Sequence, residues 1–308
     1  MKPRKYGPFE YSAIIDRPPL HWPDGARIAL WIGLNVEFYH LDLPLGGAKA
    51  PNVTRWGARD YANRVGIFRM MEMFDKHNLP VTGAVNADLC RYHPRIIQEG
   101  NKRTWEWIGH GTTSSIYLND LTRKEQRKAV ADTLDTIEEH SGRRPRGWLG
   151  QGGRESWDTL DVLSEAGVEY ICDWCNDDQP VTMRLENGRE IVAVQYAGEA
   201  NDRSELFHRN RTPEQFGDTI RRTFDVLYRE SENTGKVMCV ALHTYLSGVP
   251  HCTDALDTAF AHICGHDRIW RTTGGEILDA YRNQKRGEAK DVETRVVKQP
   301  TKRKGART

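Results

Sequence analysis

The 308-residue sequence has no run approaching the roughly 18–20 consecutive apolar residues that a membrane-spanning helix needs. Its first ten residues are polar, contain Pro3 and Pro8, and lack the apolar centre of a secretory signal. We therefore expect a cytoplasmic protein that does not interact with membranes.

Cysteines are few and irregularly spaced. Of the six, only Cys172 and Cys175 form a Cys-x-x-Cys pair, whereas a structural zinc site needs four ligands. Cys172 also lies within an apolar run, which favours ordinary core thiols. The sequence therefore predicts neither a disulfide framework nor a cysteine-based zinc site.

Nucleotide-binding motifs are also missing, because no phosphate loop and no Gly-x-Gly-x-x-Gly follows the first predicted strand. The net charge of +1 combines +6 over residues 285–308 with −5 over the rest of the chain. The acidic body argues against a nucleic-acid partner. The basic segment 284–308 has almost no apolar pattern, so we expect it to be a disordered tail.

Short apolar runs alternate with longer amphipathic stretches. The pattern predicts strands at Arg27–Asn35, Pro80–Asn86, Thr104–Gly109, Gly147–Leu149, Glu169–Trp174, Ile191–Tyr196, Lys236–His243 and Arg268–Thr272, and helices at Ala58–His77, Leu121–Ser141, Glu155–Ala166, Thr212–Glu232, Thr253–Cys264 and Gly274–Tyr281. Repeated strand–helix units imply parallel strands with helical crossovers, and their number suits a (β/α) barrel. We expect one α/β domain over residues 22–283, preceded by an N-terminal extension, residues 1–21.

In such a barrel, chemical groups gather at the carboxyl ends of the strands. The predicted strand ends carry Asn35, Glu37, Asn86, Asp88, His110, Arg154, Asp173, Asp177, Asp178 and His243. A carboxylate can take a proton from water, an imidazole can deliver one to a leaving nitrogen, and backbone N–H groups at 150–153 can hold an oxyanion. Simpler alternatives are an ion pair of Glu37 with Arg59 or Arg64, and a solvated turn at Asp177 and Asp178.

Over residues 22–283 the chain resembles the polysaccharide deacetylase family, whose fold is a distorted barrel of seven β/α units. The resemblance depends on the order and spacing of the Glu37 segment, His110-Gly111-Thr112-Thr113-Ser114, Arg144-Pro145-Arg146-Gly147-Trp148, Asp173-Trp174 and Leu242-His243. It implies a distorted (β/α)7-type barrel.

Metal-dependent members of that family carry a base Asp, a ligand Asp, a His-x-x-x-His ligand pair and a late His that acts as general acid. By this resemblance, Glu37 matches the base and Phe38 stands at the ligand Asp. His110 matches the first ligand His, Ser114 replaces the second, and His243 matches the late His.

Two of the three expected ligands are therefore missing, and we expect no metal cofactor. Zinc remains open only if Asp88, Asp177 or Asp178 supplies a ligand. Leu149 stands where the family has an Arg that orients the base, and Arg154 is a candidate replacement.

These departures are similar to the branch of metal-independent allantoinase and related cyclic amide and ureide hydrolases. The resemblance implies a hydrolase of non-peptide carbon–nitrogen bonds acting on a small amide, imide or ureide, in a homo-oligomer. Glu37 would be the general base, His110 would orient water or polarise the carbonyl, and His243 would be the general acid. The candidate substrate-binding residues are Asn35, Trp148, Arg154, Trp174, Asp177, Asp178 and Tyr245.

Two alternatives stay open. One is a zinc-dependent polysaccharide or amino-sugar deacetylase in the same barrel. The other is a barrel that binds a ligand without chemistry.

Overall fold

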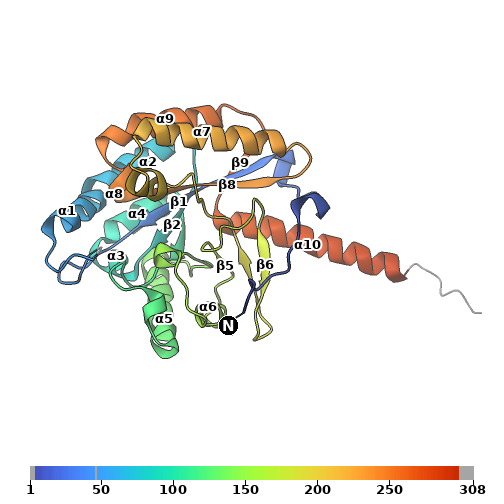
Figure 1. The fold of residues 1–308 in the computed structure, drawn as a ribbon, viewed down its shortest axis with the longest axis horizontal. Coiled ribbons are helices and arrows are strands. Elements are labelled where there is room, and N and C mark those ends of the chain that lie inside the picture. Colours follow the sequence, from blue (N-terminus) through green and yellow to red (C-terminus); the bar gives the residue numbers. More distant parts are fainter. Residues whose placement is uncertain (1–3, 46, 298–308) are drawn as a thin grey trace, which may run out of the picture.

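The computed structural model describes residues 4–45 and 47–297, and its centre is a curled sheet surrounded by helices (Figure 1). The strands are β1 (Ile28–Val36), β2 (Val81–Val85), β3 (Glu106–Gly109), β4 (Gly147–Trp148), β5 (Tyr170–Ile171), β6 (Val181–Arg184), β7 (Glu190–Ala193), β8 (Lys236–His243) and β9 (Ile269–Thr272). The α-helices are α1 (Val53–Tyr61), α2 (Ile67–Lys76), α3 (Ala87–Tyr92), α4 (Pro94–Lys102), α5 (Arg123–Ser141), α6 (Thr159–Glu165), α7 (Pro213–Glu230), α8 (Thr244–Ser247), α9 (Thr253–Cys264) and α10 (Gly274–Val297).

Short 3-10 or π turns connect several of these elements: η1 (Ile14–Asp16), η2 (Pro23–Gly25), η3 (Ala62–Gly66), η4 (Leu118–Asp120), η5 (Gln151–Gly153), η6 (Arg203–His208) and η7 (Pro250–Cys252). The π turn η3 joins α1 to α2, so the helix predicted at Ala58–His77 begins earlier, at Val53. The sequence pattern missed α3, α4 and β6.

The sheet has the order β6-β7-β5-β4-β3-β2-β1-β8, with β9 paired to the start of β1. Its pairs are parallel except for the antiparallel β6–β7 ribbon. The curl brings β7 toward β8, but there the ladder is replaced by two backbone bonds, Val237 N to Asp178 O at 2.8 Å and Ala241 N to Ala200 O at 2.9 Å. We call this gap the seam. The predicted distorted (β/α)7-type barrel in a single α/β domain is confirmed.

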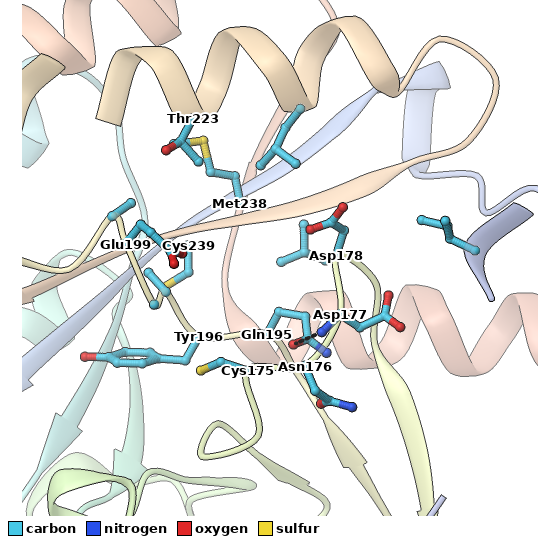
Figure 2. Close-up of a pocket in the computed structure, with 16 residues that line it drawn as sticks. Cys175, Asn176, Asp177, Asp178, Gln195, Tyr196, Glu199, Thr223, Met238 and Cys239 are labelled. Carbon is cyan, nitrogen blue, oxygen red and sulfur yellow. Dashed lines mark hydrogen bonds between the residues drawn. The ribbon is translucent and has the colours of Figure 1, made fainter. Parts of the chain in front are cut away.

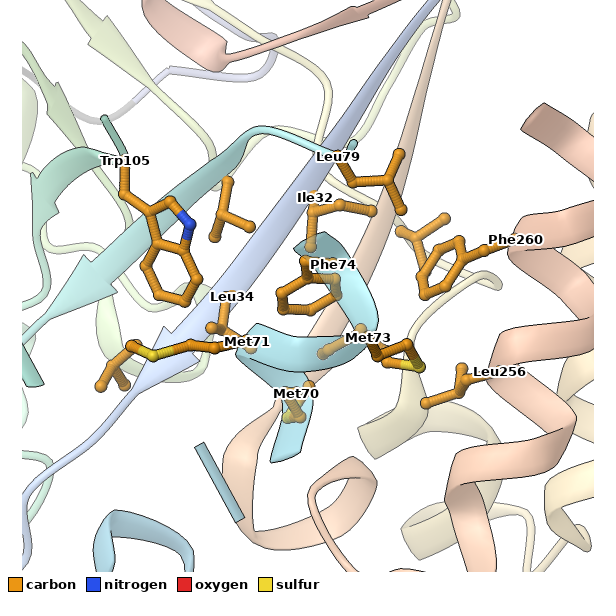
Figure 3. Packing of buried hydrophobic residues seen from close by; sticks show 14 of the residues in the cluster. Ile32, Leu34, Met70, Met71, Met73, Phe74, Leu79, Trp105, Leu256 and Phe260 are labelled. Atoms are coloured by element: carbon orange, nitrogen blue, oxygen red, sulfur yellow. The ribbon is translucent and has the colours of Figure 1, made fainter. Parts of the chain in front are cut away.

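Alternation along β1 divides the core between the outside and the inside of the barrel. Leu30, Ile32 and Leu34 face outward, where they pack with α2, α7 and α9. Figure 3 shows this outer layer, in which the ring of Phe74 lies 6.2 Å from Trp105 and 6.1 Å from Phe260. Trp31 belongs to the inner cluster. Because successive strand residues point to opposite faces, β1 has to be apolar throughout, as its sequence is.

Two of the predicted helix starts are confirmed in atomic detail. Thr122 and Glu125 form a capping box at α5, and Thr212 and Gln215 form one at α7. These caps fix where the chain leaves a rim loop and enters a helix that covers the barrel.

The N-terminal extension packs against the barrel at the end where the strands begin. Arg17 donates to both carboxylate oxygens of Asp177 at 2.8 and 2.6 Å, and Pro8 accepts a bond from Arg184 N at 2.8 Å. At the other terminus, residues 284–297, predicted to be disordered, continue helix α10, so that prediction is wrong for them. Residues 298–308 lie outside the described residues.

No helix in the described part of the chain is both long and apolar enough to cross a membrane. The six cysteines are free thiols; four are buried, Cys264 is partly buried, and Cys175 is exposed, so the prediction of core thiols fails at Cys175.

Candidate active site

Strand register places the ends of β1, β2, β3 and β8 side by side. Asn35 pairs with His243, Val36 with Val85, and Val85 with Gly109. The residues that follow these strands therefore meet at one edge, which we call the rim. The rim gathers Glu37, Asn86, His110 and His243, four polar residues that are each at most 7% exposed.

The Glu37 carboxylate lies at the centre of this group. Its Oε1 accepts a hydrogen bond from the Tyr39 hydroxyl at 2.9 Å and lies 3.6 Å from His110 Nε2. Burial alone would raise the pKa of Glu37, but His110, His243 and Ser114 together hold that pKa well below its usual range. Oε2 is buried and has no hydrogen-bond partner among the described residues. Glu37 is therefore ionised, with one oxygen available to a ligand or a water.

His110 is held in one orientation. Its Nδ1 lies 2.6 Å from the carbonyl oxygen of Leu149, and because a carbonyl can only accept, Nδ1 carries the proton. Nε2 is therefore the nitrogen that faces Glu37. Leu149, which occupies the position of the family's orienting Arg, thus acts on the site through its backbone.

His243 is paired with Asp202, a residue that the sequence did not suggest. Asp202 is 0% exposed, and its Oδ1 lies 2.7 Å from His243 Nδ1. Its Oδ2 accepts bonds from His243 N and from the Ser247 hydroxyl, both at 2.6 Å. The carboxylate therefore fixes the imidazole with Nδ1–H turned away from Glu37 and Nε2 left for the site.

Asn86 connects the loops that carry Glu37 and His110. Its Oδ1 accepts from Phe38 N at 2.8 Å and from Ser114 Oγ at 3.0 Å, and its Nδ2 donates to His110 O at 2.6 Å. Because Asn86 is 0% exposed, these three bonds are made without competition from water. One amide thus holds the ends of β1, β2 and β3 in register.

Alternating tyrosine and arginine side chains surround Glu37. Arg59 lies over the rings of Tyr39 and Tyr245, at 4.5 and 4.4 Å from their centroids. Arg203 Nη1 donates to Tyr245 Oη at 3.3 Å. Burial lowers the pKa of Arg203, but the neighbouring Tyr245 and the carboxylate of Glu37 raise that pKa by more, so the guanidinium stays charged.

Arg154 completes this arc by lying 4.6 Å over the ring of Tyr117. Tyr117 in turn acts electrostatically on Arg203. The predicted residue Tyr245 is thus brought to the rim with the three predicted catalytic residues, whereas Arg154 is exposed and, among the described aromatic rings, lies over that of Tyr117 only. Sequence reasoning named Arg59 only as a possible partner of Glu37, and it missed Arg203.

A second pair of acids, Glu155 and Asp173, is partly buried beside Gly150 and Trp174. Burial and the neighbouring Asp173 raise the pKa of Glu155 to about 8, and burial raises the pKa of Asp173 to about 6. Asp173 Oδ1 accepts from Gly150 N at 2.7 Å, and Glu155 Oε1 accepts from Trp174 Nε1 at 2.8 Å. These two carboxyl groups are partly screened from water and lie close together. They share one proton, because ionising both would place two negative charges side by side.

Metal-dependent members of the family hold a metal at this place in the fold, but the side chains present here lack the matching ligand atoms. Phe38 has no ligand atom, and its ring stacks on Tyr92 at 4.9 Å with an interplanar angle of 7°. Ser114 Oγ donates to Asn86 rather than pointing a lone pair at His110. Asp88 binds His40 and Arg91. The donor set left at the rim does not fit the zinc site of the metal-dependent members.

Asp177 and Asp178 lie at the seam, near the start of β8, so the structure does not bring these two predicted substrate-binding residues together with Glu37, His110 and His243. After β5 the chain turns back along the seam toward the end where the strands begin. There Asp177 binds Arg17, and Asp178 accepts from Nζ of Lys236, the first residue of β8. Neither carboxylate can therefore join His110 in binding a metal ion at the rim.

The same two acids line a cavity of about 510 Å³ at the seam, together with Cys175, Tyr196 and Cys239 (Figure 2). Glu37, His110 and His243 are not among its lining residues. We place the candidate active site at the rim because the interacting titratable groups converge there.

The side chains of three further predicted substrate-binding residues pack or hydrogen-bond within the protein itself. Trp148 is 0% exposed and packs in the outer core with α5 and α6, so it cannot line a binding wall. Asn35 Nδ2 donates to Tyr196 Oη at 2.6 Å and to Leu242 O at 3.1 Å. Trp174 donates to Glu155 and meets Phe9 of the N-terminal extension edge to face.

The predicted oxyanion donors are partly used as well. Gly150 N donates to Asp173, and Gly153 N donates to Gly150 O at 3.0 Å. Of the backbone N–H groups at 150–153 predicted to hold an oxyanion, those of Gln151 and Gly152 are therefore the ones still available.

Comparison with known proteins gives consistent results. Residues 60–171 match the model of the polysaccharide deacetylase family. A protein of Schizosaccharomyces pombe (strain 972 / ATCC 24843) named "Putative polysaccharide deacetylase" is 24% identical over 240 residues, covering 72% of this chain and 74% of that protein. The predicted resemblance to this family is confirmed.

Two solved structures share the fold. The crystal structure of PuuE allantoinase is 25% identical, with a TM-score of 0.79 and coverage of 87% of this chain and 94% of that one. A structure described as a "probable Polysaccharide deacetylase" from Pseudomonas aeruginosa PAO1 is 25% identical, with a TM-score of 0.78 and coverage of 87% and 95%. The predicted class, a hydrolase of carbon–nitrogen bonds other than peptide bonds, is confirmed at the level of the family.

Proposed function

We propose that this chain, with its polysaccharide deacetylase match over residues 60–171, hydrolyses a small amide, imide or ureide by acid–base catalysis at the rim. The observation that carries the proposal is the ionised, buried carboxylate of Glu37 between His110 and the His243–Asp202 pair. A small substrate is proposed rather than a polymer because Phe38 and Ser114 replace two ligands of the metal-dependent polysaccharide deacetylases, and PuuE allantoinase, whose name states its activity, shares 25% identity and the fold over 87% of this chain.

The proposed reaction begins with a water bound between Glu37 and the substrate carbonyl. Glu37 Oε2, which has no protein partner among the described residues, takes a proton as the water oxygen bonds to the carbonyl carbon. His110, fixed through its Nδ1 by the carbonyl oxygen of Leu149, uses Nε2 to hold the water in line with Glu37. The carbonyl oxygen becomes an oxyanion that backbone N–H groups near Gln151 stabilise.

The carbon–nitrogen bond then breaks. His243 Nε2 delivers a proton to the leaving nitrogen, while Asp202 keeps the ring oriented from the other side. The products are a carboxylic acid and an amine, amide or urea nitrogen. Proton transfer from Glu37 through solvent to His243 restores the starting state.

The test measures hydrolysis of a panel of cyclic imides, ureides and N-acetyl amino sugars by wild type and Glu37→Gln. We expect turnover by wild type and a rate about 10²- to 10⁴-fold lower in the variant, the usual contribution of general acid–base catalysis. Glu138→Gln, at a surface carboxylate that pairs with Arg144, is the matched control and should keep the wild-type rate. Wild-type activity in Glu37→Gln would refute the assignment.

The two alternatives give different outcomes in the same panel. A zinc-dependent deacetylase would lose its activity on chelation and regain it with zinc. A binding barrel would turn over nothing, yet one compound would raise its melting temperature. A homo-oligomeric assembly and a cytoplasmic location are further parts of this proposal; the six free thiols favour a reducing compartment.

A further inference from the structure

Positive charge is in excess around Glu37. Arg59 and Arg203 both contact Tyr245, and neither of them forms an ion pair with any side chain that the structure describes. Opposite them are two buried carboxylates, Glu37 and Asp202, and Asp202 is occupied by His243. Two guanidinium groups, one acting directly on Glu37 and one stacked on its hydrogen-bond partner Tyr39, thus accompany a carboxylate that has no cationic partner other than imidazole among the described ion pairs.

Aromatic stacking leaves the donors of these arginines open to a ligand. Arg59 lies between two phenol rings and uses Nη1 on Arg55 O at 3.0 Å, while its Nε is buried and has no partner among the described residues. Arg203 uses Nη1 on the Tyr245 hydroxyl. A buried N–H without an acceptor costs free energy that an oxygen of a ligand would recover.

Tyr245 joins this arrangement to the reaction centre. Its ring centroid lies 5.7 Å from that of His243, and burial followed by the charge of Glu37 raises the pKa of its hydroxyl to about 12. The hydroxyl therefore stays protonated, and Tyr245 lies between the proposed general acid and both Arg59 and Arg203.

The geometry points to a subsite for a carboxylate, so that the substrate is an amide, imide or ureide carrying an acidic group, held by Arg59 and Arg203. Guanidinium groups bind carboxylates through paired N–H donors, and rings stacked on them restrict their movement before the ligand arrives. The inference rests on the proposed function for the reacting bond. The inference adds to the proposed function that the substrate carries a negative charge away from the bond that is hydrolysed.

The test compares hydantoin-5-acetate with its neutral carboxamide, two compounds that differ only in the acidic group. Binding is measured by titration calorimetry, independently of turnover, and kcat/KM is measured where hydrolysis occurs. We expect the carboxylate to bind about 10- to 100-fold more tightly. Arg203→Gln should remove that preference with little change in carboxamide binding, and Arg203→Lys should restore part of it. Arg144→Gln, at an exposed arginine in the loop after α5 that pairs with Asp135 and Glu138, is the matched control.

The outcomes separate the two proposals. Turnover of both compounds at equal kcat/KM would overturn the carboxylate subsite and leave the hydrolase intact. Preferential, Arg203-dependent binding without turnover would support the subsite and count against hydrolysis of this substrate. Equal binding of both compounds, or a preference that survives in Arg203→Gln, would overturn the inference.

A second cluster, on the outside of the barrel, carries an independent inference. One ligand atom each from Asp225, His262 and His266 lies within 4.8 Å of the others, bridging α7 and the end of α9. His262 Nε2 lies 2.7 Å from Asp225 Oδ1. His266 Nδ1 lies 2.9 Å from the carbonyl oxygen of His262, so its other nitrogen keeps a lone pair. From this set we infer a divalent transition-metal site of the zinc type, with a fourth position left for water.

Titration of chelator-treated protein with zinc chloride tests this site. We expect one zinc per chain, weaker binding at pH 5 because the imidazoles must be neutral, and binding at least about tenfold weaker in His266→Gln. His140→Gln should bind as wild type does. Saturation that is absent, or unchanged in His266→Gln, would overturn the inference. Zinc held here should leave hydrolysis unaffected, so zinc content alone is no sign of a catalytic metal.

Discussion

Replacing Asp202 with Asn changes the hydrogen-bond partner of His243 Nδ1 while keeping nearly the same side-chain size and shape. Asp202 Oδ2 accepts from His243 N and Ser247 Oγ, and Oδ1 faces His243 Nδ1. An asparagine can keep the first two bonds by placing its oxygen at the Oδ2 position. Its NH₂ group then faces Nδ1, where a donor would meet a donor. The imidazole can relieve that contact only by losing the Nδ1 proton.

In Asp202→Asn, His243 is thus confined to a neutral tautomer and can no longer present an imidazolium to the leaving nitrogen. We expect kcat to fall by about 10²- to 10⁴-fold, the contribution of a general acid, with KM nearly unchanged. Because one of three buried bonds is lost, the free energy of unfolding should fall by only about 1–3 kcal/mol. The variant should therefore remain folded at 25 °C.

Steady-state kinetics and thermal melting on the same samples provide the assay. Substrates with better leaving groups should suffer less, because they need less protonation as the bond breaks. Ser247→Ala removes one bond to Asp202 but leaves its charge, and should keep kcat within about threefold. A folded Asp202→Asn with wild-type kcat, or a loss confined to KM, would refute the assigned role of His243.

Three further predictions concern stability. The pKa of Glu155 is raised above its unfolded value, so the stability that its proton provides is present below about pH 4.5 and is lost as pH rises through about 8. The difference in melting temperature between pH 5 and pH 8 should therefore be smaller in Glu155→Gln than in wild type. If that difference is the same in both proteins, Glu155 and Asp173 do not share a proton. Arg17→Gln breaks the pair with Asp177 and should lower the free energy of unfolding by about 1 kcal/mol in urea titration. It should leave kcat intact, because the pair lies at the end away from the rim. Asn86→Ala leaves three buried groups without their partner and should cost about 2–4 kcal/mol in the same titration; a loss under 1 kcal/mol would mean the loops are held by other contacts.

The fold could be predicted because its signals are local. β8 coincides with the predicted Lys236–His243, and the capping boxes at Thr122 and Thr212 mark the starts of α5 and α7. Each depends on apolar periodicity or on residues three apart. The approximate position of the rim followed from the rule that strand ends meet.

The errors at the site come from what local pattern does not contain. A two-residue strand such as β4 gives no alternation, so nothing indicated that Trp148 faces outward while Leu149 supplies a carbonyl to His110. Asp177 looked like a strand-end residue because sequence does not show the chain turning back along the seam. Asp202 lies 41 residues before His243, in a loop without a motif, and only the folded chain joins them.

The seam has a consequence for how the barrel moves. The ladders around β1, β2 and β3 are long, with eight residue pairs between β1 and β8 and five between β1 and β2, whereas β4 joins β3 through one pair and β5 through two. At the seam, two isolated backbone hydrogen bonds, donated by Val237 N and Ala241 N, connect the two sides of the barrel. The amide protons of these two residues should therefore exchange with solvent earlier than those of β1. The rim residues on β1, β2 and β3 lie on the uninterrupted side, so slow breathing of the wall leaves their mutual distances unchanged.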